Sequence, residues 1–316
     1  MRYFVYIDGL VGVETNTKQF KWSFGSTAPE TTYENYEKCK IKVRLMLCGD
    51  KDVFEGKEIE SAKGCFRHFR GNQNENTLYY KQCLLKICKL NYYLKIDDNF
   101  IDVRVGKTYY ELIKYKIMNI HPIWYIVFDI VTGMLLLKGY LPIYSSVVSK
   151  ENSEAIVIFG PPNMGKTFTA LKLCEEKKLS LISEDIAITD GENVYSVPWT
   201  NSYREYGNTI NNRTVKKAIC GKSVKYAFVL ERGKKKILSN AEDIARKGLL
   251  LNHYLVCYAN SPIVIAMSYF NDNFSVEKMI ETEKKIFIQM LSGAQSACLI
   301  EESAEQYCDT ICEIIN

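Results

Sequence analysis

The chain has 316 residues, which is enough for two domains with sizeable hydrophobic cores. Its hydrophobic content of 47% and charged content of 25% are those of an ordinary globular protein, so a disordered or fibrous chain is excluded. The net charge of +4 is small for this length, and no arginine-rich tract or basic motif with interleaved aromatics occurs. We therefore expect no nucleic-acid partner.

Residues 1–108 predict a β-rich N-terminal domain. Aromatic and β-branched residues separated by turn signals predict strands at the following ranges: 3–7, 19–24, 40–47, 84–96 and 99–105. From residue 109 to 137 the pattern becomes helical, and Pro122 predicts that a helix ends at His121. We place the domain boundary after residue 108.

Eleven cysteines raise the question of disulfides or a metal site. There is no CxxC motif, the closest pairs are Cys83/Cys88 and Cys308/Cys312, and no histidine stands in a metal-ligand pattern. We expect reduced cysteines that pack as small hydrophobes. The N-terminus lacks the apolar core of a signal peptide, and the apolar stretch at 123–137 is too short to span a bilayer. We therefore expect a cytoplasmic protein with no membrane partner.

A phosphate-binding loop of the form GxxxxGK(S/T) is the strongest motif in the chain. It consists of Gly160, Pro161, Pro162, Asn163, Met164, Gly165, Lys166 and Thr167. The glycines permit a tight turn beside an anion, Lys166 reaches the β- and γ-phosphates, and the Thr167 hydroxyl holds Mg²⁺. An apolar run at 155–159 predicts a buried strand before the loop, and apolar residues at helical spacing from 168 to 174 predict a helix after it. This context favours a nucleotide site over a glycine turn that holds no ligand.

Two adjacent carboxylates, Glu184 and Asp185, follow a strand predicted at 179–182. If this strand and the loop strand lie close in one sheet, the two acids share an edge with the loop. Phosphoryl transfer needs a carboxylate for Mg²⁺ and a group that accepts the proton of the attacking hydroxyl. We assign Asp185 to the metal and Glu184 to the general base, and an exchange of the two roles stays open. The alternative is a solvated turn at a strand end.

The remaining pattern predicts a hairpin and three helices. Residues 186–197 predict a hairpin that turns near Asp190-Gly191. Capping boxes at 239–242 and 303–306 predict the starts of two helices, and residues 276–291 predict an amphipathic helix between them.

Several segments occur in the order found in a known kinase family: residues 141–148, the phosphate loop, 183–185, 197–199 and 223–231. On these segments, residues 136–232 resemble the catalytic core of the HPr kinase/phosphorylase family, which is related in fold to phosphoenolpyruvate carboxykinase. A histidine commonly stands in that family where Tyr144 stands here, and two aspartates where Glu184-Asp185 stands. The chain looks more like diverged relatives such as the peptide serine kinases of lasso-peptide biosynthesis and kinases of free serine.

The resemblance implies an α/β fold, with a phosphoenolpyruvate-carboxykinase-like P-loop kinase core at residues 109–316 and the smaller β-rich domain before it. It implies ATP and Mg²⁺ as cofactors and transfer of the γ-phosphoryl group to a hydroxyl. The catalytic residues would be Lys166, Glu184 and Asp185, with Thr167 and Asp185 at the metal. Arg204 is our nominated substrate contact, because a guanidinium suits a phosphate near the mouth of a cleft.

The acceptor that this resemblance favours is a serine of a peptide or protein. Free serine or another small metabolite is the alternative acceptor. A nucleotide-sensing regulatory module without catalysis is the alternative of another class. Members of the family assemble into oligomers, so a homo-oligomer also stays open.

Overall fold

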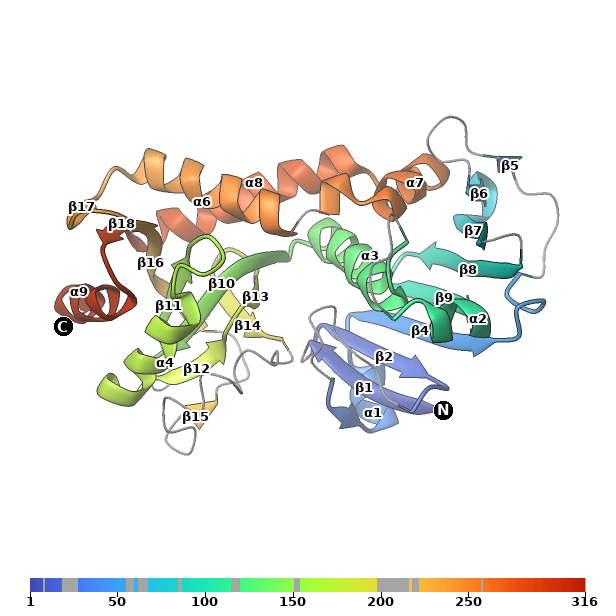
Figure 1. The fold of residues 1–316 in the computed structure, drawn as a ribbon, viewed down its shortest axis with the longest axis horizontal. Helices are drawn as coiled ribbons and strands as arrows, with labels where there is room; N and C mark the ends of the chain where they lie inside the picture. The colour runs from blue at the N-terminus through green and yellow to red at the C-terminus, as the bar shows by residue number, and fades with distance from the viewer. Residues whose placement is uncertain are drawn as a thin grey trace. The chain divides into compact units, whose positions relative to one another are not determined.

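The chain divides into two units, the first formed by residues 1–137 and 258–279 and the second by residues 138–257 and 280–316. The computed structural model describes residues 1–7, 9–18, 28–54, 60–61, 68–84, 87–114, 120–150, 154–197, 216–217, 222–256 and 258–315. Each unit contains one large mixed sheet with helices packed on it (Figure 1). The protein is therefore of mixed α/β class, as the sequence predicted.

The first unit contains a nine-stranded sheet in the order β3-β1-β2-β4-β9-β8-β7-β6-β5. Strand β4 is parallel to both β2 and β9, and the other neighbours run antiparallel. Its strands are β1 (Arg2–Ile7), β2 (Val11–Thr15), β3 (Glu30–Thr31), β4 (Ile41–Cys48), β5 (Glu60–Ser61), β6 (Phe69–Asn72), β7 (Thr77–Leu84), β8 (Cys88–Asp97) and β9 (Phe100–Gly106). Its helices are α1 (Tyr33–Glu37), η2 (Gln73–Glu75), α2 (Lys107–Leu112), α3 (Ile123–Leu137), η4 (Tyr258–Asn260) and α7 (Pro262–Phe270).

The helices α2 and α3 belong to this first unit, which corrects the expected domain boundary after residue 108. Tyr109 of α2 packs edge-on against the stacked rings of Tyr80 and Tyr92, so α2 closes the inner face of the sheet. The segment 258–279 returns to the same unit, where Phe270 of α7 lies against Gly71 of β6. Burial of these aromatic side chains joins segments that are far apart in the chain. The predicted strand at 19–24 lies outside the described residues.

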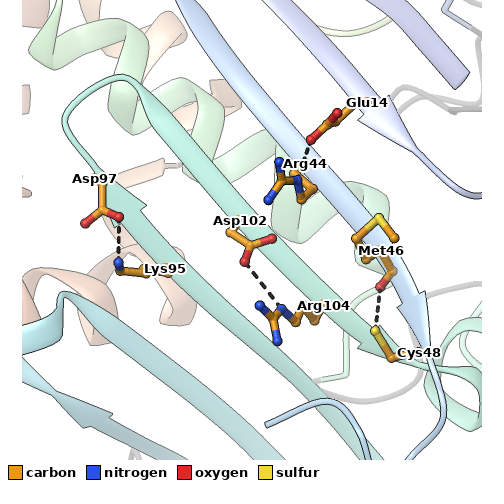
Figure 2. A network of polar contacts seen from close by, with 8 residues as sticks. All are labelled: Glu14, Arg44, Met46, Cys48, Lys95, Asp97, Asp102 and Arg104. Carbon is orange, nitrogen blue, oxygen red and sulfur yellow. Dashed lines mark hydrogen bonds and ion pairs between the residues drawn. The ribbon is translucent and has the colours of Figure 1, made fainter. Parts of the chain in front are cut away.

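The outer face of this sheet is polar. The strand predicted at 40–47 is present as β4, in which Ile41, Val43 and Leu45 are buried while Arg44 is exposed. Figure 2 shows ion pairs on this face, namely Glu14 with Arg44, Asp102 with Arg104, and Lys95 with Asp97. Opposite charges on neighbouring positions make this face compatible with water.

Asp129 is a half-buried acid in α3. Ser261 Oγ donates a hydrogen bond to Asp129 Oδ2 at 2.6 Å, and burial raises the pKa of Asp129 to about 7 although that bond opposes the rise. The folded-state pKa of Asp129 lies above its unfolded-state value. The contribution of protonated Asp129 to the free energy of unfolding is therefore complete below about pH 4 and is lost as pH rises through about 7.

Asp129→Asn should therefore raise the free energy of unfolding at pH 8 by about 2 to 4 kcal/mol, since the neutral amide is not charged at that pH. The gain should shrink strongly at pH 4.5. Urea denaturation at both pH values measures it, with the exposed Asp97→Asn as control. An equal gain at both pH values would contradict the raised pKa of Asp129.

The second unit contains the second large sheet. Its strands are β10 (Leu141–Ser149), β11 (Glu154–Phe159), β12 (Ser180–Ser183), β13 (Ile186–Thr189), β14 (Asn193–Ser196), β15 (Lys216–Lys217), β16 (Lys222–Arg232), β17 (Lys236–Leu238) and β18 (Gln295–Glu301). Its helices are α4 (Lys166–Lys177), α6 (Ala241–Val256), the part of α8 (Val276–Ser292) from Ile280 onward, and α9 (Ala304–Ile315). The predicted hairpin at 186–197 is confirmed by the antiparallel pair β13 and β14.

Helices cover both faces of this sheet (Figure 1). Ile156 and Ile158 of β11 belong to a buried cluster with Leu171 of α4 and Ile311 of α9. The next residue on the opposite face, Phe159, packs against Phe287 of α8 with its ring tilted, at 5.4 Å between ring centroids. Strand β11 is thus buried on both sides, which explains its uninterrupted apolar sequence.

The starts of two helices test the predicted capping boxes. In α9 the box is confirmed, because Ser303 Oγ accepts from the Gln306 amide and Gln306 Oε1 accepts from the Ser303 amide. At α6 the predicted cap, Ser239, is wrong: Asn240 Oδ1 accepts from the amides of residues 242 and 243. Asparagine caps helices as well as serine does, and here it lies one position closer to the helix.

No helix in the described ranges has both the length and the apolar character needed to cross a bilayer.

Candidate active site

The phosphate loop joins β11 to α4, which is the strand, loop and helix order expected from the sequence. Gly165 has a φ of 99°, and a Cβ added to it would lie 2.7 Å from the Ala304 Cβ of α9. Gly165 is therefore required both by its left-handed backbone and by the closeness of α9. At Gly160, which does not have a positive φ, an added Cβ would lie 3.3 Å from the Leu230 Cβ of β16.

The first turn of α4 faces the loop with its amide groups. Gly165 is the N-terminal capping residue, and no side chain among the described residues caps this end. The amide of Thr169 bonds to the Gly165 carbonyl at 2.8 Å, so the regular helix starts at once. A helix start with backbone N–H groups and a positive dipole end suits an anion.

Lys166 is held over the loop. Its Nζ donates to the Pro161 carbonyl at 3.1 Å and lies 4.2 Å from the centre of the Tyr144 ring. The side chain is largely buried, and burial lowers the pKa of Lys166 to about 8, against an opposing effect of the nearby Asp185 carboxylate. A cation that is poorly solvated and bonded to one carbonyl gains strongly from an incoming phosphate.

The sheet brings the acidic pair to the loop. Strands β11 and β12 both run antiparallel to β10, so they are parallel to each other and end at the same side of the sheet. Opposite Ser145 of β10 stands Phe159, the last residue of β11, and opposite Val147 stands Ser183, the last residue of β12. The two strands therefore lie in one sheet, which was the condition for the acids to share an edge with the loop.

Glu184 and Asp185 lie between two strands, β12 and β13, that pair with different parts of β10. Strand β12 pairs with residues 147–149 of β10, and β13 pairs with residues 141–144 of the same strand. Between them, the Ser145 amide donates to the Asp185 carbonyl at 2.9 Å and Ser146 Oγ donates to the Glu184 carbonyl. Such an irregularity re-aims side chains out of the regular alternation, and here it occurs at the two carboxylates.

The acidic pair contacts the loop helix directly. Thr167 Oγ1 donates to the Glu184 carbonyl at 3.1 Å. The Asp185 carboxylate lies within electrostatic reach of Lys166 and accepts a hydrogen bond from Tyr144. Burial raises the pKa of Asp185, and these two neighbours limit the rise. The Glu184 side chain is only 2% exposed, whereas Asp185 is partly exposed.

Tyr144 is a site residue that we did not predict. Its ring lies against Lys166 and its hydroxyl bonds to Asp185, so it joins the cation to the acid. The signal for it was its place in the strand before the loop, where the resembling family commonly has a histidine.

Behind Tyr144 lies a buried polar network that we also did not predict. Asn252 Oδ1 accepts from the Tyr144 amide at 2.9 Å, and its Nδ2 donates to Glu283 Oε1 at 3.0 Å. Glu283 Oε2 lies 2.9 Å from His253 Nδ1. The signal was a fully buried asparagine in line with Ile244 and Gly248 on the apolar stripe of α6. The network fixes β10 at the residue that contacts Lys166 and Asp185.

Tyr144→Phe should raise the pKa of Asp185 further, because the charged carboxylate loses the hydrogen bond from the Tyr144 hydroxyl that now lowers it. The ring under Lys166 is kept, so the fold should not change. A ¹³C NMR titration of the Asp185 carboxyl measures the effect, with the exposed Tyr254→Phe as a matched control. An unchanged or lowered pKa would show that the hydroxyl does not stabilise the carboxylate.

Arg204, the nominated substrate contact, lies outside the described residues. The other predicted site residues, Gly160 to Thr167 with Glu184 and Asp185, lie at the same end of the second unit's sheet. No family model matches the chain, and a search of curated proteins gives no significant match.

Proposed function

We propose that the second unit is an ATP- and Mg²⁺-dependent kinase core of the phosphoenolpyruvate-carboxykinase-like type. It would transfer the γ-phosphoryl group to a hydroxyl, with a serine of a peptide or protein as the acceptor. The observation that carries the proposal is the juxtaposition of Lys166, Thr167 and Asp185 at the mouth of a glycine loop. A structural glycine turn has no need for a buried lysine beside a carboxylate.

The residues present fit a nucleotide phosphate with its metal. The left-handed turn at Gly165 starts α4 at the loop, and the first amides of α4 and Lys166 Nζ supply donors for phosphate oxygens. The Thr167 hydroxyl and the Asp185 carboxylate are oxygen donors of the kind that Mg²⁺ prefers. When bound, Mg²⁺ would neutralise charge on the phosphates and polarise the γ-phosphoryl group.

The two carboxylates differ in access, and this bears on their roles. Asp185 is partly exposed and lies next to Lys166, so it can contact a ligand without rearrangement. Glu184 is buried, so to act as the general base its side chain must turn outward when substrates bind. In the exchanged assignment, Asp185 accepts the proton of the attacking hydroxyl, and Glu184 is the metal ligand beside Thr167.

The acceptor is tested with the full chain, because residues 258–279 belong to the first unit and a simple truncation would divide it. The protein is incubated with ATP labelled at the γ-phosphate, Mg²⁺ and either serine-containing peptides or free serine, and the products are identified by mass spectrometry. Phosphoserine in a peptide supports the proposal, and phosphorylated free serine alone assigns a small acceptor. Nucleotide binding without any transfer would leave a nucleotide-sensing module instead.

A further inference from the structure

A cluster of metal-ligand side chains lies between α4 and α9, away from the phosphate loop. It consists of Glu176 in the last turn of α4 and of Cys308 and Cys312 in α9. The two cysteines are four residues apart, so they lie on one face of the helix. The carboxylate oxygen and the two sulfurs all lie within 4.8 Å of one another.

The spacing of these atoms fits a tetrahedral ion. Cys308 Sγ and Glu176 Oε2 are 3.6 Å apart. With Zn–S and Zn–O bonds of about 2.3 and 2.1 Å, a tetrahedral centre places a sulfur and an oxygen ligand about 3.6 Å apart. Two thiolates are soft donors that select Zn²⁺ over Mg²⁺ or Ca²⁺, which prefer all-oxygen sites.

We propose that Glu176, Cys308 and Cys312 form a Zn²⁺ site with an open fourth position for water. Cys308 is fully buried, Cys312 is half-buried and Glu176 is exposed, so the site opens to solvent on the Glu176 side. Lys172 lies 3.6 Å from Glu176 Oε1, the oxygen that does not face Cys308. Lys172 therefore orients the carboxylate from outside the ligand shell, as partners of metal ligands commonly do.

The competing explanation is a hydrogen bond from the Cys308 thiol to Glu176 with no metal. A cysteine thiol with its ordinary pKa is mostly protonated at neutral pH, so without a metal both sulfurs carry a proton. Lys172 and Lys177 of α4 and Asp309 of α9 are further charged groups that act on them. Zn²⁺ binding must release the two thiol protons, whereas the hydrogen-bonded pair releases none.

The position of the cluster makes it distinct from the proposed magnesium site. Glu176 lies ten residues after Lys166 in α4, roughly 15 Å along the helix. At the other end of the two helices, Ala304 of α9 lies against Gly165 of the loop. A bound ion would thus join α4 to α9 at the end remote from the phosphates and stabilise their packing.

The test uses the full chain, treated with chelator and reductant and then titrated with Co²⁺ as a spectroscopic probe or with Zn²⁺. We expect a thiolate-to-Co²⁺ charge-transfer absorption at one Co²⁺ per chain, displaced by Zn²⁺, and release of about two protons per Zn²⁺. Cys312→Ser should remove this absorption. Glu176→Gln should weaken Zn²⁺ binding by at least the roughly 10-fold to 100-fold that loss of an outer-shell partner costs.

Other cysteines provide the controls. Cys83→Ser, at an exposed position of β7, should leave the absorption and the stoichiometry unchanged. Residue-resolved alkylation should show that Zn²⁺ protects Cys312 but not Cys83, and circular dichroism in chelator establishes that Cys312→Ser is folded. Equal Co²⁺ absorption in the wild type and Cys312→Ser, or no protection of Cys312, would overturn the site.

Discussion

Replacing Lys166 with alanine should reduce phosphoryl transfer by at least about 10³-fold in kcat/KM, which corresponds to about 4 kcal/mol of transition-state stabilisation. Lys166 is the buried cation of the loop, held between the Pro161 carbonyl, the Tyr144 ring and Asp185. Its removal takes away positive charge where the phosphate charge develops. Kinetics with labelled ATP and nucleotide titration by calorimetry measure the two parts of the effect.

The matched control for this variant is Lys177→Ala, an exposed lysine in the last turn of the same helix. It should leave both transfer and nucleotide affinity unchanged.

Lys166→Arg gives a second comparison. Since the pKa of Lys166 is about 8, the ammonium of the free protein loses its charge as pH rises through 8, and nucleotide affinity should fall there. Arginine keeps its charge, so the Lys166→Arg variant should not show this fall. Transfer by Lys166→Ala at the wild-type rate would exclude the loop as the catalytic phosphate site.

The acidic pair should show the second large effect. Glu184→Gln should keep nucleotide binding and lose at least about 100-fold in transfer, because the amide cannot accept the proton of the hydroxyl. Asp185→Asn should lose transfer to a similar degree and should also weaken the Mg²⁺-dependent part of nucleotide affinity, because a charged metal ligand becomes a neutral amide. Nucleotide titrations with and without Mg²⁺ separate the two variants.

The control is Glu192→Gln, an exposed glutamate in the hairpin that follows the acidic pair. It should have no effect on either quantity. The opposite pattern, in which Glu184→Gln loses the Mg²⁺ dependence and Asp185→Asn keeps it, would exchange the two roles. If both variants transfer phosphate normally, the acidic pair has no part in catalysis.

Local elements could be predicted from the sequence because their signals lie within a few residues. The phosphate loop with its flanking strand and helix, the hairpin β13-β14 and the cap of α9 at Ser303 depend on periodicity, glycine conformation and neighbouring hydrogen bonds. The helix start at α6 was misplaced by one residue for the same reason, since Ser239 and Asn240 are both good caps and local sequence hardly separates them.

The domain boundary could not be predicted, because it depends on long-range packing. Helix α2 closes the inner face of the first sheet through Tyr109, and α7 returns to that sheet through Phe270 after a long excursion of the chain. Neither contact has a signal within the helices themselves, since an apolar stripe shows that a helix is buried but does not identify its partner.

By itself, the sequence determined that a glycine loop with Lys166 and Thr167 lies between a buried strand and a helix, and that two acids follow the next strand. The order of strands decided the rest: β10 lies between β11 and β12, so the ends of those two strands reach one side of the sheet and Tyr144 comes between Lys166 and Asp185. The same packing brought Cys308 and Cys312 to Glu176, more than 130 residues away in the chain. Such contacts depend on which elements become neighbours, and that choice is made by burial of whole faces and not by the spacing of residues in the chain.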